Sequence, residues 1–202
     1  AGYWWWNGKI FPTQYPEMIG VSSRGGRIEA YQWSTPNNRK RFNDVWKLDL
    51  NSAYPFLCSH KDFPDIRTEK EEKNVDIDTL DIPTVNEYFS RLGISEVTIK
   101  APDIYVPYLP IRDKQKTLYP RKAILHGFWT NYEIQQAVTK YGYKLLQIHK
   151  TVTYKKMPFN MFENYFKKLY SIKVGEEGTL KDIAKIIMNS STGRFAMKIA
   201  NR

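Results

Sequence analysis

The residues best suited to chemistry lie in the stretch TLKDIAKIIMNSSTGRF, residues 179–195. If this stretch is a helix, one face carries four polar residues at helical spacing: Lys181, Lys185, Asn189 and Thr192. Ammonium and amide groups in a row can bind a phosphate chain and the base attached to it. The alternative is a lysine face that simply lies in solvent, and the pattern of a single helix does not separate the two.

The same stretch has an apolar stripe, which predicts that a protein core holds the helix in place. The stripe consists of Leu180, Ile183, Ala184, Ile187 and Met188. Gly193 is the expected end of the helix, because glycine readily takes the left-handed conformation of a C-cap.

A second candidate group is Asp49, which comes just before a turn at residues 51–55. Alternating apolar residues predict a strand over residues 42–50, with Asp49 at its end on the face opposite the core. A carboxylate at such a place can hold a hard cation such as Mg²⁺. An aspartate beside a turn also commonly caps that turn, so Asp49 alone decides nothing.

Local signals predict the elements that would position these residues. Capping-box pairs, Thr84 with Glu87 and Thr130 with Glu133, each open a predicted helix. Gly93 is the expected end of the first and Gly142 of the second.

Further elements follow from periodicity. Strands are expected at residues 94–100 and 143–154, and an aromatic stripe predicts a core-facing helix that begins near Asn160. The mixed-charge run at residues 69–81 is expected to be a solvated loop.

The composition is that of a folded protein, since 42% of residues are hydrophobic and 26% are charged. Basic residues outnumber acidic ones, and the formal net charge is +10. Positive charge mixed with 15% aromatic residues suits nucleic acid, although an acidic membrane surface would also attract it. The single cysteine excludes an internal disulfide and a multi-cysteine metal site. No apolar run reaches the ~18 residues of a membrane helix, so no membrane partner and a cytoplasmic location are expected.

Two segments together resemble family B DNA polymerases. Residues 49–55, DLNSAYP, resemble their motif A, D-x-x-S-L-Y-P, and residues 185–193, KIIMNSSTG, resemble their motif B, K-x-x-x-N-S-x-Y-G. Lys173 precedes Lys185 by the twelve positions that separate two lysines in the protein-primed branch of this family, found in phages, viruses and linear plasmids. Residues 23–26, SRGG, resemble the Y-x-G-G element of that branch.

The resemblance implies a role for each matching residue. Asp49 would be one of two carboxylates that hold Mg²⁺ or Mn²⁺, and the Leu50 carbonyl would also reach a metal. The residues implied to bind the incoming deoxynucleotide are Tyr54, Lys173, Lys185, Asn189 and Thr192. Those implied to contact primer-template DNA are Arg24, Gly25, Gly26, Ser52, Gly193 and Arg194. The implied partners are a DNA primer-template, a dNTP and a priming terminal protein; a viral protein would act in the host cytoplasm.

The sequence departs from the family pattern at several positions. Thr192 stands where motif B has a tyrosine, Ala53 where motif A has a leucine, and Ser23 where the glycine element has a tyrosine. The third motif, Y-x-D-T-D-S, does not occur in the 202 residues, and no acidic pair resembles a proofreading exonuclease site. Since Asp49 alone cannot hold two metals, the chain is expected to be either a fragment of a polymerase or one piece of a split enzyme. In the second case, a second polymerase chain that carries the third motif is an expected partner. The alternative is a catalytically inactive, polymerase-derived module that binds DNA or docks on a larger assembly.

The expected fold is α+β: an incomplete family B palm with a short antiparallel sheet, a helical fingers element and an inserted α/β subdomain. The expected boundaries are residues 1–56 for palm strands with motif A, residues 57–125 for the inserted subdomain, and residues 126–202 for palm and fingers helices with motif B.

Overall fold

The computed structural model describes Met18, Arg27 and residues 43–50, 52–76, 82–113 and 116–193. The chain divides into two compact units. One contains Ala1–Ser23 and Lys61–Asn160 and is called the sheet unit. The other contains Arg24–His60 and Met161–Arg202 and is called the helical unit. Residues 24–26 and 194 lie outside the described residues.

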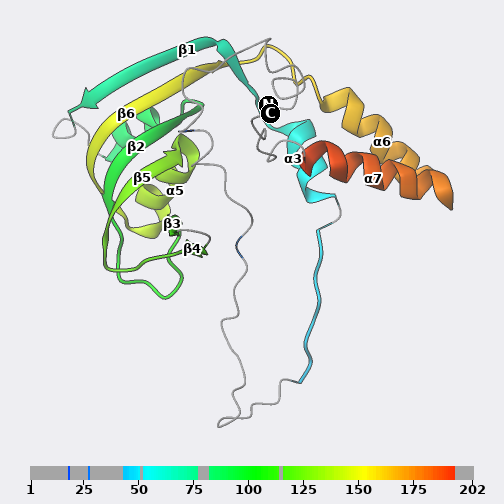
Figure 1. The fold of residues 1–202 in the computed structure, drawn as a ribbon, viewed down its shortest axis with the longest axis horizontal. Helices are drawn as coiled ribbons and strands as arrows, with labels where there is room; N and C mark the ends of the chain where they lie inside the picture. The colour runs from blue at the N-terminus through cyan, green and yellow to red at the C-terminus, as the bar shows by residue number, and fades with distance from the viewer. Residues whose placement is uncertain are drawn as a thin grey trace, which may run out of the picture. The chain divides into compact units, whose positions relative to one another are not determined.

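The sheet unit is built on a four-stranded antiparallel sheet with the order β1-β6-β2-β5 (Figure 1). Its strands are β1 (Pro64–Val75), β2 (Gly93–Lys100), β5 (Ile124–Thr130) and β6 (Lys144–Lys156). A separate hairpin pairs β3 (Ile111–Asp113) with β4 (Lys116–Leu118). Because β5 and β6 belong to this sheet, the unit runs past the boundary predicted at Leu125.

Two helices, α4 (Ile82–Tyr88) and α5 (Asn131–Tyr141), pack on one face of this sheet. Val85 of α4 and Ile134 of α5 lie in one buried cluster with Val97, Trp129 and other sheet residues. The Trp129 indole is fully buried, and its Nε1 donates a hydrogen bond of 2.8 Å to the Pro110 carbonyl. Burial of these side chains is the main term that holds helices and sheet together.

A buried polar network joins the sheet to the start of α5. The Ser95 hydroxyl donates to Asn131 Oδ1 at 2.7 Å and lies 2.8 Å from the Thr151 hydroxyl, while Asn131 Nδ2 donates to the Arg91 carbonyl at 3.0 Å. Gly93 lies against this network, since a Cβ there would come within 2.4 Å of the Val152 carbonyl oxygen. The position therefore excludes any larger residue unless the strands separate.

The helical unit consists, in its described part, of α3 (Ala53–His60), α6 (Glu163–Gly175) and α7 (Thr179–Gly193), which contact one another. Phe166 of α6 and both Ala184 and Met188 of α7 are buried. The Tyr165 and Ser191 hydroxyls lie 2.8 Å apart and link α6 to α7.

Several expectations are confirmed. The helix at residues 179–193 has the predicted bounds, and β2 and β6 cover the predicted strands. The capping box of α5 forms both of its hydrogen bonds around Thr130 and Glu133, and Gly142 ends the helix with φ of 70°. The mixed helix and antiparallel-sheet fold class is confirmed as well.

The mixed-charge run at residues 69–81 was expected to be a loop, and this was wrong for its first half, which belongs to β1. β1 is an edge strand, so charged side chains are tolerated on it and oppose pairing with other chains. Partners on neighbouring elements hold its charges, as when Lys150 lies 2.9 Å from Glu71.

The strand predicted at residues 42–50 is not seen in residues 43–50, which have no regular secondary structure and are exposed throughout. A strand requires a hydrogen-bonded neighbour, and in the described ranges none lies beside this segment. The short palm sheet that was expected to carry Asp49 is therefore not present among the described residues.

Two helix predictions need correction at their ends. α4 begins at Ile82, before the expected Thr84, because Pro83 is well tolerated in a first turn; Gly93 begins β2 instead of ending the helix. α6 begins at Glu163 and not near Asn160.

The apolar stripes of α6 and α7 are less buried than expected. Leu180, Ile183 and Ile187 are 56%, 45% and 38% exposed, because the described helices contact α7 along only part of its surface. No helix in the described ranges is long and apolar enough to cross a bilayer.

Candidate functional site

The motif A residues lie where an extended segment leads into α3. Asp49 is exposed, and Leu50 is 80% exposed, in the segment before the turn. Ser52 has a positive φ of 54°, a conformation that non-glycine residues adopt rarely and that often marks a constrained site. Its carbonyl accepts a hydrogen bond of 2.9 Å from the Phe56 amide, which starts the helix. Tyr54, two residues on, is 65% exposed.

Ser52 contacts a residue far along the chain. The Lys173 ammonium donates a hydrogen bond of 2.8 Å to the Ser52 hydroxyl, within the helical unit. Lys173 belongs to the last turn of α6, where a positive charge interacts favourably with the helix dipole. The fold thus joins motif A to the lysine that precedes motif B.

Tyr170 is a neighbour of Lys173 that the sequence did not reveal as a site residue. The Lys173 ammonium lies 5.8 Å from the centre of the Tyr170 ring, within the range of a cation–π interaction. The aromatic stripe had assigned Tyr170 to the core, whereas it is 46% exposed. The useful signal was its i, i+3 spacing from Lys173, which places both on one side of a helix.

The motif B residues lie on α7. Lys185 and Asn189 are exposed, one position beyond the buried Ala184 and Met188. Packing of those two apolar side chains therefore fixes the direction in which this polar row faces. Thr192 and Gly193 are in the last turn, and the side chain of Thr192 is not among those described. Arg24, Gly25, Gly26 and Arg194 lie outside the described residues.

The described residues do not by themselves fit a metal site. Asp49 supplies one carboxylate, and no group of three or more His, Cys, Asp or Glu residues in the described ranges is arranged to hold a metal ion. Mg²⁺ needs several oxygen ligands at near-octahedral positions. Among the motif residues, the contact that the structure shows is the hydrogen bond from the Lys173 ammonium to the Ser52 hydroxyl, a positive group beside a polar one.

Comparison with known proteins identifies the family of this chain. The family model described as DNA polymerase type B, organellar and viral, matches residues 17–202. The chain belongs to this family. The resemblance that motifs A and B indicated is thereby confirmed.

Two curated relatives carry related names. The DNA polymerase of Acidianus bottle-shaped virus (isolate Italy/Pozzuoli) is 24% identical over 171 residues, which are 81% of this chain and 25% of that protein. A probable DNA polymerase of Podospora anserina is 28% identical over 181 residues, 90% of this chain and 13% of that protein. The chain thus spans a quarter or less of the length of these relatives.

Solved structures of Phi29 DNA polymerase share the fold. An orthorhombic crystal form has a TM-score of 0.63 and 21% identity, covering 94% of this chain and 33% of that one. The complex with primer-template DNA and incoming nucleotide substrates has a TM-score of 0.58 and 20% identity, covering 92% of this chain and 32% of that one. The likeness shows that the chain shares its fold with part of these structures.

Proposed function

We propose that this chain forms the part of a protein-primed family B DNA polymerase that binds the incoming deoxynucleotide and transfers it to a DNA or protein primer. The observation that carries the proposal is the hydrogen bond between Ser52 and Lys173, because it joins motif A to the lysine that precedes motif B. Phi29 DNA polymerase forms a complex with primer-template DNA and incoming nucleotide substrates, which supports the same substrates here.

In this proposal each of the residues implied by the motifs acts on a defined part of the substrates. Lys173 and Lys185 neutralise the triphosphate, since ammonium groups are strong donors to phosphate oxygens. Asn189 lies beside the new base pair, and the Tyr54 ring lies under the deoxyribose, where it excludes a 2′-hydroxyl. Thr192 would complete the nucleotide side of α7. Ser52 approaches the primer end, and Arg24, Gly25, Gly26, Gly193 and Arg194 contact the DNA backbone.

The divalent ion, Mg²⁺ or Mn²⁺, requires more ligands than the described residues supply. We infer that Asp49 and the Leu50 carbonyl contribute to its site and that the remaining carboxylate comes from a further segment or chain with the third motif. A priming terminal protein is a further inferred partner.

Primer extension tests the proposal. The chain is assayed alone and with candidate partner chains, with Mg²⁺ or Mn²⁺, and Asp49→Asn is compared with Asp44→Asn, an aspartate of the same exposed segment. We expect extension in at least one combination, reduced about 100-fold or more by Asp49→Asn and unchanged by Asp44→Asn. Absence of extension in every combination, or equal activity of the two variants, would contradict it.

The second candidate is a catalytically inactive module that binds DNA or docks in an assembly, and the threonine at position 192 favours it. It predicts DNA binding that weakens linearly on a log–log plot against salt, without nucleotide incorporation. DNA affinity no greater than that of an acidic protein of similar size would exclude the DNA-binding form of this candidate. Gel filtration with the neighbouring chains tests the docking form, which requires co-elution.

A further inference from the structure

Lys173 of α6 is held by two uncharged groups. Its ammonium donates a hydrogen bond of 2.8 Å to the Ser52 hydroxyl and lies 5.8 Å from the centre of the Tyr170 ring. It forms no ion pair with any described residue. Within the described ranges, no acid therefore balances the charge of this ammonium, although its position is defined by contacts.

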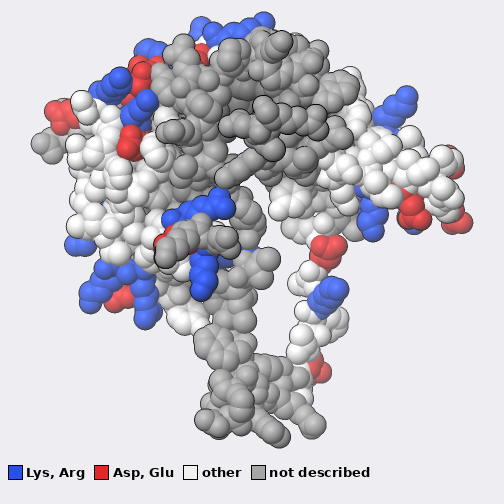
Figure 2. Space-filling model, viewed as in Figure 1, with Lys and Arg blue, Asp and Glu red and all other residues white. Residues whose placement is uncertain are grey.

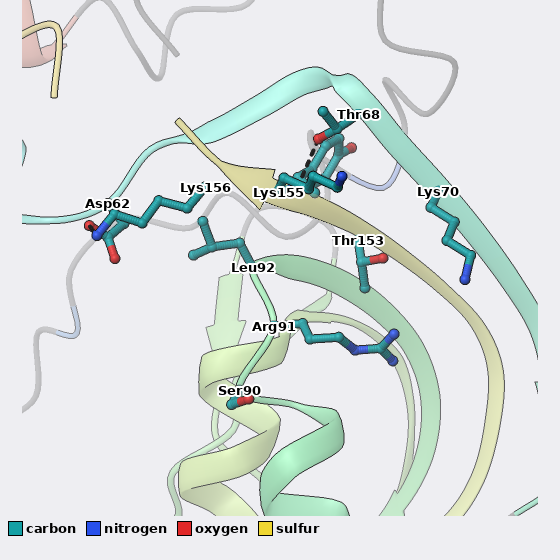
Figure 3. A pocket seen from close by; sticks show the side chains of 10 residues that line it. Asp62, Thr68, Lys70, Ser90, Arg91, Leu92, Thr153, Lys155 and Lys156 are labelled. Carbon is teal, nitrogen blue, oxygen red and sulfur yellow. Dashed lines mark hydrogen bonds and ion pairs between the residues drawn. The ribbon is translucent and has the colours of Figure 1, made fainter. Parts of the chain in front are cut away.

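Several cations of the sheet unit are held differently. Lys70 and Arg91 line a pocket where β1, β6 and the segment between α4 and β2 meet (Figure 3), and they lie 3.3 and 3.0 Å from the Glu72 carboxylate. Lys156 of the same pocket pairs with Asp62 at 2.6 Å. Acidic side chains also lie among the basic ones on the visible surface over β1 and β6 (Figure 2). An acid beside a cation weakens the attraction of that cation for an added anion, whereas uncharged partners leave it intact.

Tyr170 lies between two anchored points of α6. Phe166, Tyr170 and Lys173 are spaced at i, i+4 and i+7, so they share one side of the helix. Phe166 is buried, and Lys173 bonds to Ser52 near the end of α6. Tyr170 is 46% exposed and Lys173 is partly exposed, so an anion from solvent can reach this pair.

An aromatic ring can hold an ammonium group without cancelling its charge. The negative face of the ring attracts the cation, and this attraction does not require a conventional hydrogen bond. An ammonium has three N–H donors, of which the Ser52 hydroxyl accepts one. Two donors therefore remain for the oxygens of a phosphate chain. A carboxylate in place of the ring would accept a further hydrogen bond and neutralise the charge.

We propose that Tyr170 is a positioning residue of the proposed nucleotide site. Its ring keeps the Lys173 ammonium in the place from which the ammonium binds the triphosphate, and Tyr170 acts only through Lys173. The inference rests on the proposed function, because the triphosphate at Lys173 is part of that proposal. Tyr170 belongs to neither motif A nor motif B, so the motifs alone do not indicate this role.

The test compares two substitutions of Tyr170 in the full 202-residue chain. Tyr170→Phe keeps the ring, whereas Tyr170→Leu removes it and leaves a residue that suits a helix at least as well. Tyr132→Leu, at an exposed tyrosine of α5, is the control. Calorimetry measures the affinity for deoxythymidine triphosphate with Mg²⁺, and circular dichroism confirms that each variant is folded. Tyr170→Leu is also measured in a Lys173→Gln background.

We expect Tyr170→Leu to weaken binding about threefold, the equivalent of about 0.7 kcal/mol, which is the range of a cation–π contact at an exposed site. Tyr170→Phe and Tyr132→Leu should bind as the parent chain does. In the Lys173→Gln background, Tyr170→Leu should cause no further loss, because the group that the ring positions is gone. A ring that only supports the fold of α6 would weaken binding in both backgrounds.

Three results would overturn the inference while the parent chain still binds the nucleotide. They are an unchanged affinity of Tyr170→Leu, an equal loss with Tyr170→Phe, and a loss in the Lys173→Gln background as large as in the parent. Absence of saturable binding by the parent chain itself would contradict the proposed function and this inference together. The behaviour of the parent chain therefore distinguishes the two failures.

Discussion

Ser52 is the single residue on which the assembly of the proposed nucleotide site depends most. It combines a left-handed backbone with a hydroxyl that accepts from Lys173 at 2.8 Å. The backbone conformation turns the chain into α3, and the hydroxyl holds an ammonium group that would otherwise move freely on a long side chain. These two contributions can be separated, because glycine keeps the backbone conformation and removes only the hydroxyl.

We therefore predict that Ser52→Gly weakens deoxynucleoside triphosphate binding by about fivefold, the equivalent of one hydrogen bond of about 1 kcal/mol. Calorimetric titration measures the affinity. Ser171→Ala is the control, because the Ser171 hydroxyl bonds only to the backbone of its own helix in the described structure. Equal affinities of the two variants would mean that Ser52 does not position Lys173.

Glu72 gives a second residue-scale prediction, which concerns stability. Its side chain is 24% exposed, and the hydrogen bonds from Arg91 lower its pKa to about 2 from the ordinary value of 4.5. A lowered pKa in the folded state means that stability is fully present above about pH 4.5 and is lost as the pH falls towards 2. Glu72→Gln should thus lower the free energy of unfolding by about 2 kcal/mol at pH 7.

Urea unfolding between pH 7 and pH 2 measures this effect. The difference between the parent chain and Glu72→Gln should shrink as the pH falls from about 4.5 towards 2, because the unfolded parent chain then binds a proton at Glu72 that the folded chain does not yet bind. Glu87→Gln, at an exposed position of α4, is the control and should change little. A difference that stays constant over this pH range would contradict the assigned role of the charge.

Among the elements, α5 is the one whose start and end are fixed most clearly by local chemistry. The Thr130 hydroxyl accepts from the Glu133 amide at 3.3 Å, and the Glu133 carboxylate accepts from the Thr130 amide at 2.9 Å. Thr130→Ala should lower the free energy of unfolding by about 1 kcal/mol. Thr139→Ala in the same helix removes only a bond to the Gln135 carbonyl and should have a smaller effect. Thermal unfolding followed by circular dichroism compares them, and equal losses would refute the cap.

The contrast between α5 and β1 shows what the sequence could predict. The start and end signals of α5 lie in the helix or directly beside it, so the sequence alone could predict where the helix begins and ends. β1 was not, because its charged side chains become compatible with a strand only through pairing with β6 and the bond from Arg91 to Glu72. Residues 43–50 alternate as a strand does, but alternation does not supply a neighbour for pairing.

For the whole molecule, the family could be predicted from two motifs, whereas the contact between Ser52 and Lys173 could not. Ser52 and Lys173 are 121 positions apart, and only the packing of α3 on α6 places one beside the other. The net charge of +10 favoured anionic ligands without indicating which positive group would lie beside motif A.

The central claim is that residues of motifs A and B form one triphosphate site. The most direct test is the affinity of the chain for a deoxynucleoside triphosphate with Mg²⁺, measured by calorimetry. We predict saturable binding that Lys173→Gln and Lys185→Gln each weaken by about tenfold or more. Lys168→Gln, at an exposed position of α6, should leave it unchanged. Absence of saturable binding, or the same affinity for all three variants, would contradict the claim.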